Sequence, residues 1–264
     1  MPALRFVQVD AFADRPFAGN PAAVMALDHW LDDTLLQAIA AENNLAETAF
    51  LVPQAGPDAD YALRWFTPAS EVMLCGHATL ASGHFVLAEH PDREIVRFAT
   101  RHAGTLTVAR SGEGYALDLP SWPATPRPLP ELSRLVGGAP IETLWRDGGY
   151  AMFVYASEQA VRALRPDFAT LAQGEKLLII ATAPGCDHDV VSRAFAPAQG
   201  IFEDPVTGSA HAVIASYWAE RLGRSRFTAY QASKRGGSLD CTLEGDRVIL
   251  RGGCVTVIEG RFRL

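Results

Sequence analysis

Two short segments of the sequence place reactive side chains around a glycine at the start of an apolar run. The first is Cys75-Gly76-His77-Ala78, and the second is Thr207-Gly208-Ser209-Ala210. The first N–H groups of a helix lack acceptors within the helix and carry the positive end of its dipole. Each segment therefore predicts an anion site, and the two together would grip a carboxylate or stabilise negative charge developing on one. Taken singly, either glycine is more typical of a plain turn before a surface helix.

Glu47 is the acid whose surroundings best suit proton transfer. It lies in Asn44-Leu45-Ala46-Glu47-Thr48-Ala49-Phe50-Leu51, a segment otherwise apolar enough to be buried. Burial disfavours the charged form of a carboxyl group, which suits it to accepting and returning protons. The competing interpretation is a solvated residue at the end of a strand.

Four further side chains are candidates, and each also has a plain structural interpretation. His77 can donate or shuttle a proton, or it simply caps the helix. Asp204 precedes Pro205 and is either a site acid or an ordinary turn residue. Cys75 precedes a helix N-terminus, which lowers the pKa of a thiol, but a small buried apolar residue fits the position equally well. Asn20, between Gly19 and Pro21, can bind a substrate carboxylate or make an Asx turn.

The elements that must position these side chains occur twice along the chain. Phe66-Thr67-Pro68-Ala69-Ser70 comes before the first glycine segment, and Phe195-Ala196-Pro197-Ala198-Gln199 comes before the second. Ten residues separate Phe66 from Gly76, and thirteen separate Phe195 from Gly208. The second copy therefore carries an insertion of three residues, which we expect in the region of Glu203-Asp204-Pro205.

A proline-rich stretch divides the two copies near the middle of the chain. Ser121 to Pro130 contains four prolines, which disfavour a helix or a central strand and indicate a linker. We expect an N-terminal half over residues 1–120, to which a strand near 256–264 returns, and a C-terminal half over 130–255. The patterns predict strands at Phe6–Phe12, Ala22–Leu27 and Leu45–Val52, and helices from Asp32 or Asp33 to Asn43, from Gly76 to about Glu89 and from Gly208 to Leu222.

Composition excludes several classes of function. The 264 residues carry a formal net charge of -7 without any long block of like charge, which disfavours a nucleic-acid track or a polybasic membrane anchor. Four scattered cysteines without a C-x-x-C pair, and an amino terminus unlike a secretory signal, predict a reduced cytoplasmic protein with a small-molecule partner. The dinucleotide, P-loop, zincin and hydrolase-elbow motifs are absent from the sequence, and Cys186-Asp187-His188-Asp189 is more typical of a polar loop than of a metal site.

These segments together resemble the phenazine-biosynthesis PhzF-like isomerases, which share the fold of diaminopimelate epimerase. The similarity covers Gln8-Val9-Asp10-Ala11-Phe12 with Phe17-Ala18-Gly19-Asn20-Pro21, the Glu47 segment, Arg64-Trp65-Phe66-Thr67-Pro68 with the first glycine segment, and Phe195-Ala196-Pro197 with Glu203-Asp204-Pro205-Val206 and the second. It implies an α+β fold of two pseudo-symmetric domains, each a mostly antiparallel sheet around a central helix, and a homodimer. It also implies a cofactor-free, metal-free site between the domains.

By the same resemblance, Glu47 moves the proton, His77 and Asp204 are further catalytic groups, and Ser209 completes the polar set. Gly76 and Gly208 bind the substrate carboxylate, with Asn20 as a further substrate contact. The related epimerases and proline racemases place a cysteine before each glycine, whereas this chain has Cys75 in the first copy and Thr207 in the second. A threonine hydroxyl is a far poorer base than a thiol, so the sequence disfavours a symmetric two-thiol reaction.

Three functions follow from these residues. The first is a cofactor-independent isomerase in which Glu47 transfers a proton on a small carboxylate-bearing substrate, shifting a double bond or inverting a centre. The second is an amino-acid epimerase or racemase with Cys75 as a secondary acid/base. The third is a carboxylate-binding protein without catalysis. The physiological substrate is not encoded in any motif of the sequence.

Overall fold

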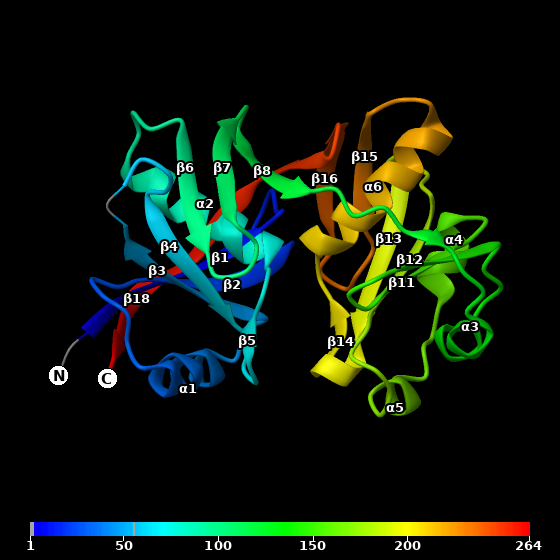
Figure 1. The fold of residues 1–264 in the computed structure, drawn as a ribbon, viewed down its shortest axis with the longest axis horizontal. Coiled ribbons are helices and arrows are strands. Elements are labelled where there is room, and N and C mark those ends of the chain that lie inside the picture. The colour runs from blue at the N-terminus through cyan, green and yellow to red at the C-terminus, as the bar shows by residue number, and fades with distance from the viewer. Residues whose placement is uncertain (1–2, 55) are drawn as a thin grey trace. The chain divides into compact units, whose positions relative to one another are not determined.

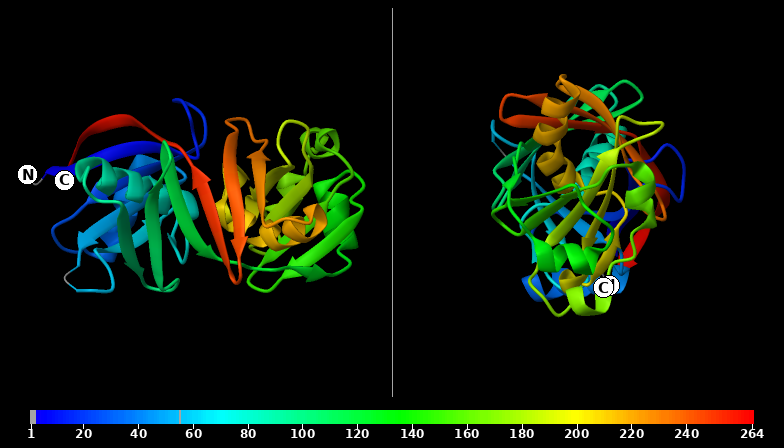
Figure 2. Two further views of the ribbon diagram at one scale, coloured as in Figure 1. Left: turned by 90° about the horizontal axis from the view of Figure 1, so that it is seen from above. Right: turned by 90° about the vertical axis from the view of Figure 1, so that its right-hand side faces the viewer.

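The computed structural model describes residues 3–54 and 56–264. The chain forms two compact units, the first made of Met1–Leu119 with Arg251–Leu264 and the second of Pro120–Leu250. The C-terminal strand thus belongs to the same unit as the N-terminal strand. In Figures 1 and 2 these two strands, coloured blue and red, run side by side. Each unit is described by itself below.

The first unit is a mostly antiparallel sheet. Within it β1 pairs antiparallel with both β18 and β2, and the only parallel pairs among its registered strands are β2 with β3 and β4 with β6 in the described part of the chain. The elements of this unit are β1 (Ala3–Ala11), β2 (Asn20–Ala26), α1 (Asp33–Asn43), β3 (Glu47–Pro53), β4 (Tyr61–Phe66), β5 (Glu71–Val72), α2 (Gly76–Glu89), β6 (Ile95–Thr100), β7 (Thr105–Ser111), β8 (Gly114–Pro120) and β18 (Cys254–Arg263).

Helix α2 is the central helix of the first unit. Eleven of its fourteen residues are buried, because the helix is apolar all round and contacts strands on several sides. Figure 1 shows it lying among β1, β2, β6 and β7. Gly83 allows the closest approach, since a Cβ atom at this position would lie 2.3 Å from Cγ1 of Val108 on β7. The burial of α2 carries its N-terminal residues, with their polar side chains, into the interior.

The second unit repeats this plan around α6. The short strand β9 (Thr125–Pro126) pairs with β10 (Glu142–Arg146), so the proline-rich segment is hydrogen-bonded to the sheet of this unit. The elements of this unit are β9 (Thr125–Pro126), α3 (Pro130–Val136), β10 (Glu142–Arg146), β11 (Tyr150–Val154), α4 (Glu158–Ala163), α5 (Phe168–Leu171), β12 (Leu178–Pro184), β13 (Val190–Ala196), the 3₁₀ helix η1 (Pro197–Gln199), β14 (Ile201–Asp204), α6 (Gly208–Leu222), β15 (Arg226–Gln231), β16 (Gly237–Glu244) and β17 (Arg247–Gly252).

The strand pairings of the two units correspond one to one. In the first unit β2 and β3 are parallel, β3 and β4 antiparallel, and β4 and β6 parallel. In the second, β11 and β12 are parallel, β12 and β13 antiparallel, and β13 and β15 parallel. In both units the central helix follows a short strand: β5, which pairs with β4, precedes α2, and β14, which pairs with β13, precedes α6. The predicted pseudo-symmetric fold of epimerase type is confirmed.

A charged pair is repeated with the fold and extends the Phe-x-Pro repeat by two residues. Arg64 binds both carboxylate oxygens of Glu71 at 2.7 Å, and Arg193 binds those of Glu203 at 2.7 and 3.1 Å. Each guanidinium also lies over the ring of the phenylalanine two residues later, at 5.0 and 4.9 Å. The repeated motif is therefore Arg-x-Phe-x-Pro followed by Glu, and it fixes the alignment of the two copies.

This alignment corrects the expected position of the insertion. Seven residues separate Arg64 from Glu71, whereas ten separate Arg193 from Glu203, so the three extra residues precede Glu203. They lie in the turn around η1, between β13 and β14. The prediction that they fall at Glu203-Asp204-Pro205 was wrong. Asp204, which pairs with Ala194, instead corresponds to Val72, which pairs with Trp65.

Among the described residues, we find no helix that is both long and apolar enough to span a bilayer.

Candidate active site

Glu47 is the first residue of β3, and its side chain is buried. The residue is 8% exposed, and its Cα pairs with that of Ala22 on the parallel strand β2. The preceding helix α1 ends at Asn43, and the left-handed backbone of its C-cap Asn44 (φ 49°) turns the chain into this strand. The interpretation of Glu47 as a solvated strand-end residue was therefore wrong.

His77 lies in the first turn of α2, with its Nε2 atom 2.9 Å from Oε2 of Glu47. Both residues are buried, and neither of these two atoms has a hydrogen-bond partner elsewhere among the described residues. The pair therefore faces each other in a low-dielectric interior, where interactions between charges are stronger than in water.

Two other candidates approach the opposite nitrogen of the same ring. Nδ2 of Asn20 lies 3.1 Å from Nδ1 of His77, and Sγ of Cys75 lies 3.5 Å from it. The Asn20 amide can present its nitrogen to a bare Nδ1 or its oxygen to a protonated Nδ1, so it supports either charge state of the imidazole. Asn20 thus binds a histidine rather than making the turn that its sequence context allowed.

The charge states of His77 and Cys75 are coupled. Burial lowers the pKa of His77, but its contacts with the Cys75 and Glu47 side chains, including hydrogen bonds to both, raise it, and the net pKa lies well above the ordinary value. Burial, followed by the charge of Glu47, raises the pKa of the Cys75 thiol to about 11. At neutral pH the Cys75 thiol is therefore protonated. The expectation that the helix N-terminus lowers the Cys75 pKa was wrong, because burial and Glu47 outweigh it.

The arrangement fits a proton relay better than a metal centre. Glu47, Cys75 and His77 place ligand-type atoms within 4.8 Å of one another. The thiol faces Nδ1 of the imidazole, however, while the carboxylate faces Nε2. The imidazole can therefore take up a proton from one neighbour and release one to the other through its two nitrogens.

In the second unit, Asp204 and Thr207 form a buried polar cluster with Gln231. The Thr207 hydroxyl donates to Oδ2 of Asp204. Gln231, which is fully buried, accepts from Thr207 N at 2.8 Å and donates to Asp204 O at 2.7 Å and to Thr207 Oγ1 at 3.0 Å. Its position at the end of β15 carries no sequence signal, so Gln231 was missed.

Ser209 occupies in α6 the place that His77 occupies in α2, two residues after the N-cap. Its side chain hydrogen-bonds Tyr150, whose pKa burial raises and this hydrogen bond lowers, with a net increase. Tyr150 packs on Trp122 with ring centroids 5.5 Å apart. Tyr150 and Trp122 were also missed, since an aromatic residue near a linker is common in any core.

A second buried histidine lies one turn into α6. His211 Nδ1 donates to Thr207 O at 2.8 Å, as Thr79 Oγ1 in α2 donates to Cys75 O at 2.6 Å. Burial lowers the pKa of His211 to about 4, so the ring is neutral at physiological pH. His211 therefore anchors the carbonyl of the N-cap residue rather than carrying charge.

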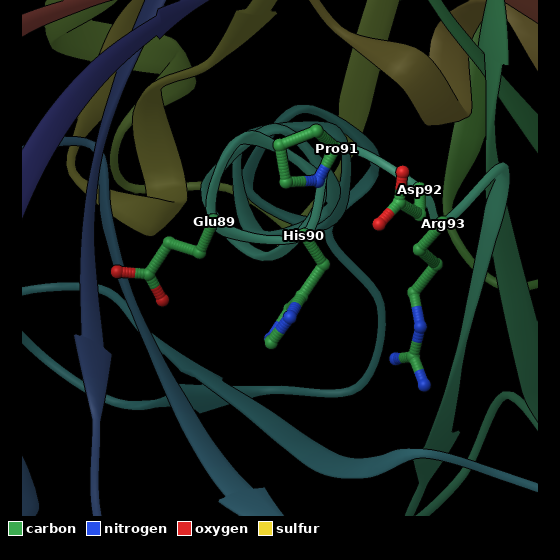
Figure 3. Close-up of a pocket in the computed structure, with 5 residues that line it drawn as sticks. All are labelled: Glu89, His90, Pro91, Asp92 and Arg93. Atoms are coloured by element: carbon green, nitrogen blue, oxygen red, sulfur yellow. The ribbon is translucent and has the colours of Figure 1, made fainter.

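A hollow of about 530 Å³ lies at the other end of α2 and is distinct from this site. Figure 3 shows Glu89, His90 and Arg93 spread around the helix end. The charged groups are engaged there, since Glu89 pairs with Arg5 and Arg93 with Asp60. At 1.5 Å per residue, His77 and His90 are separated by about 20 Å along the helix.

The structure thus brings together the polar candidates of the first copy. Asn20, Glu47, Cys75 and His77 meet at Gly76, the first residue of α2. Asp204 and Ser209 flank Gly208, the first residue of α6. Both helices begin at the predicted glycines, and α6 ends at Leu222 before a left-handed Gly223, as predicted.

The profile of the phenazine biosynthesis-like protein family, PhzC-PhzF, matches residues 9–260. The chain belongs to this PhzF family. An isomerase of Pseudomonas aeruginosa, named as uncharacterized, is 48% identical over 264 residues, covering 99% of both chains. The crystal structure of a PhzF-family phenazine biosynthesis protein from Enterococcus faecalis matches all of both chains with a TM-score of 0.91 and 42% identity. As a member of this PhzF family, the chain is an isomerase.

A more distant likeness concerns the fold alone. A hydroxyproline epimerase from Agrobacterium vitis superposes with a TM-score of 0.65 at 12% identity, covering 98% of this chain and 92% of that one. The PhzF-family chain thus has the architecture of the epimerases, and its chemistry has to be argued from its own site.

Proposed function

We propose that this PhzF-family isomerase moves a proton with Glu47, without a cofactor, on a small carboxylate-bearing substrate. The observation that carries the proposal is the buried contact between Glu47 Oε2 and His77 Nε2. It joins a carboxylate to an imidazole whose pKa is raised, beside a helix N-terminus. Paired titratable groups in such an environment are typical of acid/base sites.

In the proposed reaction, Glu47 removes a proton from a carbon next to an activating group. The C–H bond breaks, its electron pair delocalises into that group, and Glu47 becomes a carboxylic acid. After the acid proton of Glu47 has exchanged with water, a proton is delivered to a different carbon, or to the other face of the same carbon, and the carboxylate is restored. Atoms and charge balance without any redox partner.

His77 and Asn20 would set the state of Glu47. The protonated imidazole favours the ionised carboxylate before proton removal, and Asn20 holds the ring from its other nitrogen. Both contacts come from elements of one unit, α2 and β2, so the geometry is built into a rigid scaffold.

The first N–H groups of α2 and α6 are the proposed carboxylate donors. Gly76 and Gly208 begin these helices, and neither helix has an acidic residue in its first turn to occupy the donors. Preorganised donors of this kind stabilise charge that develops in a transition state. Asp204 and Ser209 complete the polar set of the proposal from the second unit.

Cys75 is the base of the alternative epimerase reaction, and its environment argues against that role. Its thiol is 6% exposed and has a pKa of about 11. The corresponding residue in the second copy is Thr207, whose hydroxyl is already bonded to Asp204. Neither group is suited to act as a base at neutral pH.

A screen for hydrogen exchange in deuterated water tests the proposal. Purified protein is incubated with a panel of small carboxylates, including amino acids, and deuterium incorporation is read by mass spectrometry. We expect incorporation that Cys75→Ala retains and Glu47→Gln loses. The opposite pattern at the α-carbon of an amino acid would support the epimerase. Tight binding with no exchange across the panel would support a binding protein.

A further inference from the structure

We propose that Gln231 is a positioning residue that fixes the Asp204 carboxylate through Thr207. This inference rests on the proposed function, because it concerns how the acid of the second unit is held. Gln231 touches Thr207 at two atoms and the Asp204 backbone at one, all within 3.0 Å.

The hydrogen bonds of Gln231 determine the direction of every proton in the cluster. Its Oε1 accepts from Thr207 N, so its other amide atom, Nε2, is the one that faces Asp204 O and Thr207 Oγ1. Because Thr207 Oγ1 accepts from Nε2, its own proton is directed to Oδ2 of Asp204. Asp204 thereby receives a donor, which favours the carboxylate form over a carboxylic acid.

A fully buried amide needs all of these partners. Gln231 has no exposed surface, and a buried amide without hydrogen bonds is destabilising. His211 adds a third anchor, since its Nδ1 donates to the carbonyl of Thr207. The N–H, hydroxyl and carbonyl of Thr207 are therefore all bonded, and its hydroxyl direction is fixed.

The other copy of the fold shows that this cluster is not required by the architecture. Ser192 on β13 pairs with Gln231, and Leu63 on β4 pairs with Thr100, so Thr100 occupies the equivalent place. Thr100 Oγ1 bonds Gly104 O in a turn, and Val72 stands where the second unit has Asp204. Gln231 and Asp204 thus occur together in the second unit, and the equivalent positions of the first unit hold neither a glutamine nor an acid.

Two single variants and their double variant test whether Gln231 acts through Thr207. Gln231→Met keeps the volume and removes the hydrogen bonds, and Thr207→Val removes the hydroxyl. Turnover is measured on the carboxylate with the highest deuterium incorporation in wild-type protein. We expect each single variant to lower kcat about 10-fold to 100-fold, with KM within about threefold. The kcat of the double variant should be no lower than that of the less active single variant.

A spectroscopic readout tests the same contact without a substrate. In protein labelled with [γ-¹³C]aspartate, the Asp204 signal is assigned by its loss in Asp204→Asn. We expect it to shift in Gln231→Met and in Thr207→Val and to stay in place in Thr100→Val, the matched control. Gln231→Glu, which keeps the acceptor for Thr207 N and lacks the donors, replaces Gln231→Met if the latter does not fold.

The outcomes separate this inference from the proposed function. An unshifted Asp204 signal together with wild-type kcat in the Gln231 variants would overturn the inference, as would additive losses in the double variant. Wild-type turnover in Asp204→Asn would instead remove Asp204 from the proposed function, while the shift of the signal would still report the contact.

Discussion

His77 Nε2 lies 2.9 Å from Glu47 Oε2, with both side chains buried in the first unit. The same ring meets the Cys75 thiol and the Asn20 amide at its other nitrogen. The His77 imidazole therefore links the charge state of Glu47 to that of Cys75. The predictions about Cys75 and His77 depend on this link.

Cys75 should react slowly with alkylating reagents. Its pKa of about 11 and its burial leave little accessible thiolate at pH 8. Cys186 is the internal reference, because it is exposed. Peptide mass spectrometry after iodoacetamide treatment should find Cys186 modified well before Cys75. Equal rates for the two thiols at pH 8 would contradict the assigned environment of Cys75.

His77→Gln should impair both turnover and stability, the latter in a pH-dependent way. We expect turnover to fall about 100-fold or more, as is typical when an acid/base group is removed. The folded-state pKa of His77 is raised, so its stabilising contribution is complete below the unfolded value near 6.5 and is lost as pH rises through the folded value. The gap in unfolding free energy between wild type and variant should therefore narrow as pH rises above 6.5. A constant gap, or one that also appears for the exposed His29→Gln, would contradict this.

His211 should make the protein sensitive to acid. Its folded-state pKa of about 4 lies below the unfolded value near 6.5. Its contribution to stability is present above pH 6.5 and is lost as pH falls toward 4, by about 2–3 kcal/mol at pH 4.5. Chemical denaturation of His211→Gln should show a correspondingly smaller loss of unfolding free energy between pH 7 and pH 4.5. If the variant and wild type lose the same amount, the ring is not held neutral.

Arg64→Met should destabilise the first unit. The Arg64 side chain is 3% exposed and binds Glu71 through two nitrogens and Asp33 through a third. Arg64 lowers the pKa of Glu71, and removing it leaves that acid without its main partner. Since Glu71 is partly exposed, we expect a loss of about 2–4 kcal/mol in unfolding free energy. Arg97→Met, at an exposed position on β6, is the control and should change it by less than about 0.5 kcal/mol.

The helices and the duplication of the fold were largely predictable, because glycines at helix ends and apolar runs are signals that depend on neighbouring residues alone. Gly76 and Gly208 mark the helix starts, Gly223 marks a helix end, and the apolar runs after the two glycines predict buried helices. The Phe-x-Pro repeat predicted the duplication. Its insertion was misplaced because the alignment depends on Arg64–Glu71 and Arg193–Glu203, contacts that form only when two strands pair.

The candidate site was predictable in its residue types and not in its charge balance. The Cys75 pKa depends on Glu47, which is 28 positions away and reaches it through the pairing of β2 and β3. Gln231 and Tyr150 lie at strand ends with no pattern of their own, and only the folded chain brings them to α6. The helix dipole alone predicts a lowered pKa for the Cys75 thiol. The observed shift is upward, because the effects of burial and of the Glu47 carboxylate are larger than that of the dipole.

The central role of Glu47 is tested most directly by comparing Glu47→Gln with Glu42→Gln, an exposed acid on α1. Hydrogen exchange in deuterated water is followed for the carboxylate with the highest wild-type incorporation, and binding of the same compound is measured by calorimetry. We predict that Glu47→Gln lowers exchange by at least about 100-fold while the dissociation constant stays within a few-fold, and that Glu42→Gln changes neither. Wild-type exchange in a folded Glu47→Gln protein would contradict the assignment of Glu47 as the residue that moves the proton.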